Sequence, residues 1–280
     1  MTRNNWTNEK LISRLCSQKS DKSRWDNISV LRKRPSEELF IMCVELTKSK
    51  NPKTRTIGID ILAQMGNTPR PFLKQTLKLF FEILNLESDP EVLMSLLYGI
   101  GHNNHKLKKA QVEKLCTFSN NDNIWVKKGL VYSLLGIDNP KAIETLIKFS
   151  NDKISHIRNW ATFGIGTLIE RDNKNIKKAL WDRINDKHQE TKLEAIVGLA
   201  KRKDSQINDI IKLELQKGEY GTLIFKAINE IGDKQFLPIL KQNLKLAKGD
   251  TSTNPEWLIE LKECIDNLKK HSENRDRTTA

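Results

Sequence analysis

The sequence lacks any long hydrophobic run. Its 280 residues contain no apolar segment close to the roughly 20 residues that a membrane-spanning helix requires. Residues 1–7 also carry no apolar stretch of the kind that forms a secretory signal. We therefore expect a protein that acts in the cytoplasm and does not associate with a membrane.

Cysteine is scarce and scattered. The four cysteines are far apart and form no C-x-x-C pair: Cys16, Cys43, Cys116 and Cys264. Zinc sites typically use closely spaced ligand pairs and disulfide-stabilised domains are rich in cysteine, so the pattern predicts reduced thiols and no metal. Cys116 and Cys264 fall at apolar positions of helical patterns and are expected in the core.

Catalytic motifs are also missing. The chain contains no G-x-S-x-G, no Walker loop and no H-E-x-x-H. His102 and His105 form an isolated H-x-x-H in a predicted loop, which is too weak a pattern to predict a metal ion. We expect neither an enzyme nor a cofactor.

Positive charge, by contrast, is abundant. Lysine and arginine number 48 against 35 acidic residues, giving a formal net charge of +13. The excess is spread along the chain instead of forming a terminal basic arm. Solvated lysines on helix surfaces are the simplest explanation. A nucleic acid, an anionic membrane surface and an acidic protein are the partners that such a charge attracts.

Six segments of the chain share one pattern. Each opens with Asp or Asn (Tyr220 in the last) and continues with a helical apolar pattern that ends near Gly or Ala. Aligned positions are Arg55, Leu93, Lys127, Arg158, Lys192 and Ile224. These spacings of 31–38 residues are typical of a two-helix repeat. Amphipathic stretches such as Ile176, Leu180 and Ile184 lie between the segments, and no stretch alternates as a strand would. The sequence predicts an all-α fold.

Local signals mark the helix ends. Four pairs place a capping side chain before a proline that has no N–H to satisfy: Asn51-Pro52, Asp89-Pro90, Asn139-Pro140 and Asn254-Pro255. Glycines that close segments suit C-caps or tight helix packing: Gly66, Gly101, Gly136, Gly166 and Gly232.

The pattern Asp152…Ile157-Arg158…Ala161…Gly164-Ile165 resembles bacterial HEAT-type repeats. The resemblance implies an α-solenoid of about six or seven two-helix repeats over residues 35–250. Residues 1–34 would then form capping helices around residues 11–15 and 25–31. Residues 251–280 would form a C-terminal capping helix and, over 272–280, a frayed tail.

In HEAT-like proteins, the Asp that opens a repeat and a basic residue early in its second helix form a ladder along the stack. The matching residues are Asp122, Lys127, Asp152, Arg158, Asp186 and Lys192. The resemblance therefore implies that these residues hold the repeats together instead of binding a partner. Leu93 and Ile224 depart from the pattern, so the ladder should be broken at both ends.

Helical geometry predicts which side of the second helices is free. At 100° per residue, the apolar positions −1, +3 and +7 from the ladder residue point to the core. Positions −2, +1, +2 and +5 lie opposite and should line the concave surface. In the middle repeats they carry Tyr98, Trp125, Lys128, Tyr132, His156, Asn159, Trp160 and Phe163.

Aromatic side chains interleaved with polar ones are typical of a recognition surface. Burial between repeats is the alternative for positions +2 and +5. Tyr98 and Tyr132 are the better candidates for a binding site, because a tyrosine hydroxyl requires water or a partner.

Residues 152–204 resemble a narrower group, the small HEAT-like proteins encoded beside Rhs-type polymorphic toxins, which are regarded as immunity proteins. The similarity lies in Ile157-Arg158-Asn159-Trp160-Ala161-Thr162-Phe163 and in residues 194–204. It implies a cytoplasmic, non-catalytic protein, monomeric when free, that binds and neutralises a toxin domain. The positive charge would then steer an acidic toxin surface.

Two alternatives remain open. HEAT-like DNA glycosylases are also basic solenoids that use aromatic residues and a carboxylate. Asp60, Glu91 and Glu190 occupy matching positions, but none lies beside the central tryptophans. A basic DNA-binding protein of this fold or a DNA glycosylase is therefore one alternative to an immunity protein, and a generic HEAT scaffold is the other.

Overall fold

The computed structural model describes residues 2–17, 20–217 and 220–278, with backbone only for Asp21 and for 271–278. These residues contain α-helices and short helical turns and no strand. Sixteen α-helices follow one another: α1 (Asn8–Ser17), α2 (Asp21–Arg32), α3 (Glu37–Thr47), α4 (Pro52–Ala63), α5 (Leu73–Leu84), α6 (Pro90–Gly101), α7 (Lys109–Cys116), α8 (Ile124–Leu134), α9 (Pro140–Phe149), α10 (Ser155–Phe163), α11 (Lys174–Trp181), α12 (Gln189–Lys201), α13 (Ile207–Gln216), α14 (Leu223–Ile231), α15 (Leu237–Lys248) and α16 (Pro255–Thr278).

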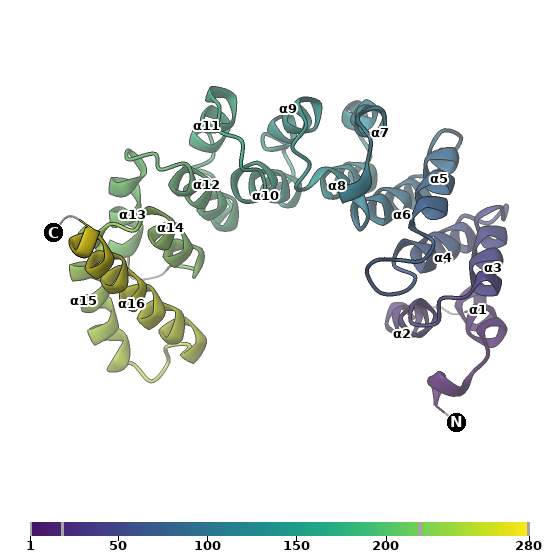
Figure 1. The fold of residues 1–280 in the computed structure, drawn as a ribbon, viewed down its shortest axis with the longest axis horizontal. Coiled ribbons are helices and arrows are strands. Elements are labelled where there is room, and N and C mark those ends of the chain that lie inside the picture. The colour runs from purple at the N-terminus through teal and green to yellow at the C-terminus, as the bar shows by residue number, and fades with distance from the viewer. Residues whose placement is uncertain (1, 18–19, 218–219, 279–280) are drawn as a thin grey trace. The chain divides into compact units, whose positions relative to one another are not determined.

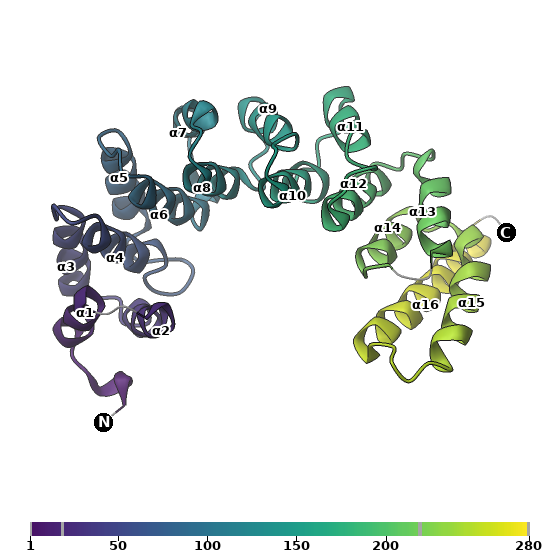
Figure 2. The ribbon, with the colours of Figure 1, turned by 180° about the vertical axis from the view of Figure 1, so that it is seen from behind.

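The chain forms two compact units, Met1–Thr145 and Leu146–Ala280, whose boundary falls within α9. In the first unit, α4, α6 and α8 pack side by side as one layer, and α3, α5 and α7 back them as a second layer (Figure 1). In the second unit, α10, α12, α14 and α16 form the corresponding row (Figure 2). Each unit is therefore an α-solenoid of two-helix repeats, as the sequence predicted.

The N-terminal segment covers one end of the first unit. Both α1 and α2 pack against α4, and Leu11, Leu15, Ile28 and Leu31 are fully or almost fully buried. At the other end of the chain, α15 packs against α16, so the expected boundary at residue 250 separates two helices that belong together. The expected tail at 272–280 is helical up to Thr278, and residues 279–280 lie outside the described residues.

The predicted core positions are buried. Val126, Leu130 and Leu134 of α8 have no exposed surface, and the same holds for Ala161, Ile165, Ala195 and Leu199 of the second unit. Cys116 and Cys264 are buried as expected, and burial raises the pKa of the Cys264 thiol to about 12. No described helix has the length and apolar character needed to cross a membrane.

The capping signals act as predicted. The side chains of Asn51, Asp89, Asn139 and Asn254 each accept a hydrogen bond from the backbone N–H two residues later. Gly166 and Gly198 serve close packing, because a Cβ on Gly198 would lie 2.6 Å from the Cα of Gly166. This contact lets α12 approach the helical turn at Gly164–Leu168.

Ion pairs connect successive repeats. Arg158 donates two hydrogen bonds to the Asp186 carboxylate, at 2.6 and 2.7 Å, and a third at 2.8 Å to the backbone oxygen of Asp152. Lys192 likewise forms an ion pair with Glu214, which lies in the next repeat. Each basic residue therefore binds an acidic residue of the following repeat, and we call these contacts the rungs.

The rungs differ in detail from the expected ladder. Arg55 and Glu87 form a bidentate rung in the first unit, although neither was among the expected ladder residues. Asp122 is exposed in the loop before Asn123, and Asn123, not Asp122, caps α8. The Asp152 side chain accepts a hydrogen bond from the N–H of Ile154. The acidic partner of Lys192 is Glu214, which lies on α13, the first helix of the next repeat, instead of an Asp that opens a repeat.

The Arg158 rung should contribute strongly to stability. The side chains of Arg158 and Asp186 are only 14% and 3% exposed, and removing one partner of a buried ion pair leaves an uncompensated charge. We expect Arg158→Ala to lower the free energy of unfolding of the second unit by about 3 kcal/mol, measured by urea denaturation. Lys178→Ala is the control, because its pair with Asp182 is 76% and 41% exposed and should change stability by less than about 1 kcal/mol. Equal losses in both variants would contradict a structural role for the rung.

Candidate functional site

The predicted recognition residues fall into two groups. Tyr98, Trp125, Lys128 and Tyr132 lie on α6 and α8 of the first unit, and we call them the unit-1 group. His156, Asn159, Trp160 and Phe163 lie on α10 of the second unit and form the unit-2 group. The sequence predicted that both groups belong to one surface. In the structure, the two groups belong to different compact units.

Two tyrosines join adjacent repeats in the unit-1 group. The rings of Tyr98 and Tyr132 lie 4.8 Å apart, tilted by 48°, and partial burial raises the pKa of both hydroxyls. Tyr132 also lies against Gly101, where a Cβ would come within 2.5 Å of its ring. Both side chains are thus half-buried between α6 and α8 instead of standing free.

Trp125 is the exposed aromatic of the same group. Its side chain is 48% exposed, and the Lys128 ammonium lies 5.0 Å from the centre of its ring. This distance is within the range of a cation–π interaction. The pair presents a large apolar surface next to a positive charge. The sequence predicted this exposure for Trp125 at position −2 and Lys128 at position +1 from the ladder residue.

The unit-2 group is a short aromatic stack. Trp160 is 37% exposed and meets Phe163 edge-on at 5.7 Å and His156 at 6.3 Å. The Asn159 side-chain N–H donates to Glu190 of α12 at 3.2 Å. Its amide oxygen is buried without a donor, so Asn159 retains unused hydrogen-bonding capacity.

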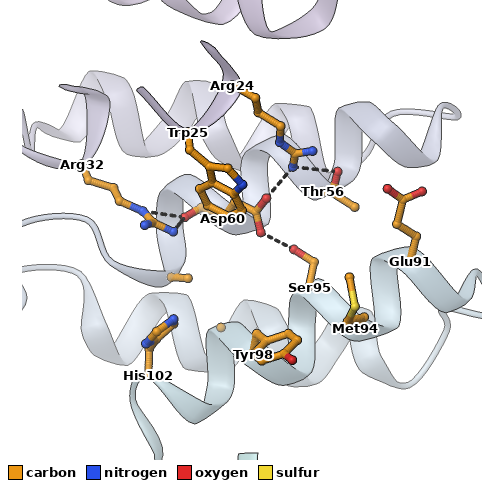
Figure 3. A pocket seen from close by; sticks show the side chains of 12 residues that line it. Arg24, Trp25, Arg32, Thr56, Asp60, Glu91, Met94, Ser95, Tyr98 and His102 are labelled. Carbon is orange, nitrogen blue, oxygen red and sulfur yellow. Dashed lines mark hydrogen bonds and ion pairs between the residues drawn. The ribbon is translucent and has the colours of Figure 1, made fainter. Parts of the chain in front are cut away.

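The structure also reveals a pocket that the sequence did not predict. It is a cavity of about 300 Å³ in the first unit, bounded by α2, α4 and α6. In Figure 3, Arg24, Trp25 and Arg32 enter from α2, and Met94, Tyr98 and His102 face them from α6. Asp60 and Ser95 lie between these two sets. We call this cavity the α2–α6 pocket.

Asp60 is fully engaged within the pocket. One carboxylate oxygen pairs with Arg24 and the other accepts a hydrogen bond from Ser95 (Figure 3). Burial raises the pKa of Asp60, and the contacts with Arg24 and Ser95 oppose that shift. A carboxylate with both oxygens bound positions its neighbours.

The two arginines enclose an indole ring. The guanidinium groups of Arg24 and Arg32 lie 5.6 and 5.5 Å from the ring centre of Trp25. Arg32 donates from Nε and Nη2 to the backbone oxygen of Asp60, at 3.0 and 2.6 Å. Arg32 therefore hydrogen-bonds a neutral carbonyl, while the Asp60 carboxylate acts on its charge through space.

His102 is the C-cap of α6 and begins the predicted loop between helices. Its Nδ1 lies 2.7 Å from the amide nitrogen of Gln64 and 3.2 Å from the Tyr132 hydroxyl. Because the Gln64 amide nitrogen is a donor, Nδ1 accepts and the ring proton resides on Nε2. Desolvation, together with Arg32 and Arg70, lowers the pKa of His102 to about 4. In the described part of the chain, no three His, Cys, Asp or Glu residues form a group that could hold a metal ion.

Sequence reasoning missed the pocket because α2 was assigned only a capping role. Asp60, Met94, Ser95 and Tyr98 were all placed on the free side of the second helices, where the structure has them. The available signal was the sequence Arg24-Trp25…Arg32, in which the arginines flank a tryptophan at helical spacing.

Comparison with known proteins gives a clear structural relative. No family model matches the chain. Protein YibA of Escherichia coli (strain K12) is 26% identical over 242 residues, covering 83% of this chain and 84% of YibA. The X-ray structure of E. coli YibA superposes with a TM-score of 0.73 at 23% identity, over 95% of this chain and 94% of that chain. An engineered protein matches with a TM-score of 0.52 at 16% identity, over 93% and 78% of the two chains.

These similarities establish the HEAT-like helical-repeat fold. The name of YibA states no activity, so it assigns neither a substrate nor a partner.

His102 provides a test of the pocket's electrostatics. We expect its ring to titrate near pH 4 in an NMR titration, because burial and two nearby arginines disfavour the imidazolium. An unfolded histidine has a pKa of about 6.5, so the unfolded chain binds a proton in this window that the folded chain does not. The stability contributed by neutral His102 should therefore fall as the pH drops from about 6.5 to about 4.

Arg70→Gln is the matched variant for this titration. It removes one of the positive charges that act on His102, so the His102 midpoint should move to a higher pH. A midpoint near 6.5 in the unaltered protein would contradict the arrangement of the pocket.

Proposed function

We propose that this chain is a non-catalytic immunity protein that binds and neutralises a cognate polymorphic toxin domain of the Rhs or type VI class. The observation that carries the proposal is the exposure of Trp125 and Trp160 on the second helices, each beside polar or cationic neighbours. An exposed tryptophan leaves much of its apolar surface in contact with water when the chain folds. Tryptophan is enriched among interface hot spots, where a partner buries that surface.

Charge supports a protein partner over a nucleic acid. The rungs hold Arg55, Arg158 and Lys192 within the fold, so these three basic residues are not available to contact a nucleic acid. Each rung also uses one acidic residue, so the net charge of +13 is unchanged. The unit-1 group contains one lysine, Lys128, and the unit-2 group contains no lysine or arginine, so neither group is a basic strip. A toxin domain with an acidic surface matches this arrangement, and its association would be accelerated by the overall positive field. The proposal includes action in the cytoplasm and a free protein that is monomeric.

The proposal predicts that a toxin domain is encoded beside this gene, and co-expression with that domain is the test. The chain should protect the cells, and the two purified proteins should form a stoichiometric complex. Trp125→Ala and Trp160→Ala should each weaken the complex by about 2 kcal/mol, the threshold for a hot spot, measured by calorimetry. Failure of protection at matched expression would overturn the proposal.

Leu86→Ala supplies the control for these variants. Leu86 is 88% exposed and lies outside both groups, so its truncation should leave affinity unchanged. Equal effects of all three variants would show that the two groups are not the interface. Duplex DNA binding with a steep salt dependence, in the absence of protection, would favour the DNA-binding alternative.

A further inference from the structure

The α2–α6 pocket holds hydrogen-bond donors that the protein does not use. Arginine has five N–H donors, and the described contacts of Arg32 engage one on Nε and one on Nη2, both with the Asp60 backbone oxygen. Three N–H groups therefore remain available. The Nε of Arg24 is buried and has no acceptor. A buried donor without a partner costs free energy, so such a group requires an explanation.

The walls beside these donors are apolar. Trp25 lies over both guanidinium groups, and Met94 and Tyr98 face it from α6 (Figure 3). Neutral His102 adds no competing charge at the Arg32 end. The exposed carboxylate of Glu91 lies at the opposite end of the pocket in Figure 3. The complementary group is a carboxylate on a short apolar stem.

The volume limits the size of the occupant. About 300 Å³ is the lower end of the range for ligand sites, which suits one side chain and not a cofactor. Arginine recognises carboxylates through parallel N–H···O bonds, and the free N–H groups of Arg32 include one on Nη1 that runs parallel to the remaining N–H of Nη2.

We propose that the α2–α6 pocket receives one acidic side chain of the partner protein, with its carboxylate on Arg32 and its methylene groups against Trp25 and Tyr98. The inference rests on the proposed function for the identity of the partner. The chemistry of the pocket is independent of it, because a carboxylate can be offered alone.

The test uses N-acetyl-L-glutamate N-methylamide as the probe and the full chain as the protein. We expect saturable shifts of the Trp25 indole N–H signal in ¹H–¹⁵N NMR spectra, with the signal assigned from Trp25→Phe. The corresponding glutamine compound, which has the same shape without the charge, should cause no saturable shift. Saturation by both compounds, or by neither, would overturn the proposal.

Variants locate the binding. Arg32→Gln should weaken the glutamate probe at least about tenfold, as expected for a lost hydrogen bond to a charged group. Met94→Trp should abolish binding by filling the cavity while leaving both arginines in place. Lys78→Gln removes the same charge from an exposed position, 79% exposed, and should bind as the unaltered protein does. Circular dichroism would establish that each variant is folded. Normal binding by folded Arg32→Gln or folded Met94→Trp would overturn the assignment.

The partner experiment separates this inference from the proposed function. If the chain protects against the toxin and Arg32→Gln weakens their complex, both are supported. If the probe binds in the pocket but no toxin is neutralised, the proposed function fails and the carboxylate site stands. If protection is normal in folded Arg32→Gln and the probe does not bind, the proposed function stands and the pocket assignment fails.

Discussion

Burial of the second helices is the constraint on which the structure depends. In the first unit, α6 packs between α4 and α8 and is backed by α5. Val92, Leu96, Leu97 and Ile100 are consequently without exposed surface. A helix held on three sides has one side left for side chains that do not enter the core. The position of Tyr98 and Trp125 follows from this packing, whereas their identity does not.

The rungs fix how the repeats follow one another. Arg158 joins Asp186 of the next repeat to the backbone before its own helix, so a single guanidinium ties together the starts of two repeats. Packing of apolar faces alone tolerates sliding, because leucine and isoleucine contacts are not directional. Bidentate ion pairs are directional. The rungs therefore specify register, and the apolar layers supply most of the stabilisation.

The fold could be predicted from the sequence because repetition makes the signal visible. The spacing from Lys127 to Arg158 and Lys192, with apolar residues at fixed offsets, determined the helices and their buried sides. The α2–α6 pocket could not be predicted in this way. It joins Arg32, Asp60 and Tyr98 from three helices, and the first of these lies outside the repeats. The repeat pattern determines which side of each helix faces the core. It does not determine which side chains of the terminal helix α2 reach α4 and α6.

The terminal helix α2 illustrates how one segment meets two demands. Its residues Ile28 and Leu31 are fully buried and cover the end of the stack. A helix that caps the end of a solenoid needs only polar side chains on its outer face. Lysine at positions 24 and 32 would meet that requirement. Arginines beside Trp25 exceed that requirement, and the buried Nε–H of Arg24 is left without an acceptor. Such donors lower stability unless something binds them. The free-energy cost of such donors is therefore better explained by recognition of a partner than by capping of the stack. On this interpretation, the positive charges of Arg24 and Arg32 in the N-terminal segment serve binding.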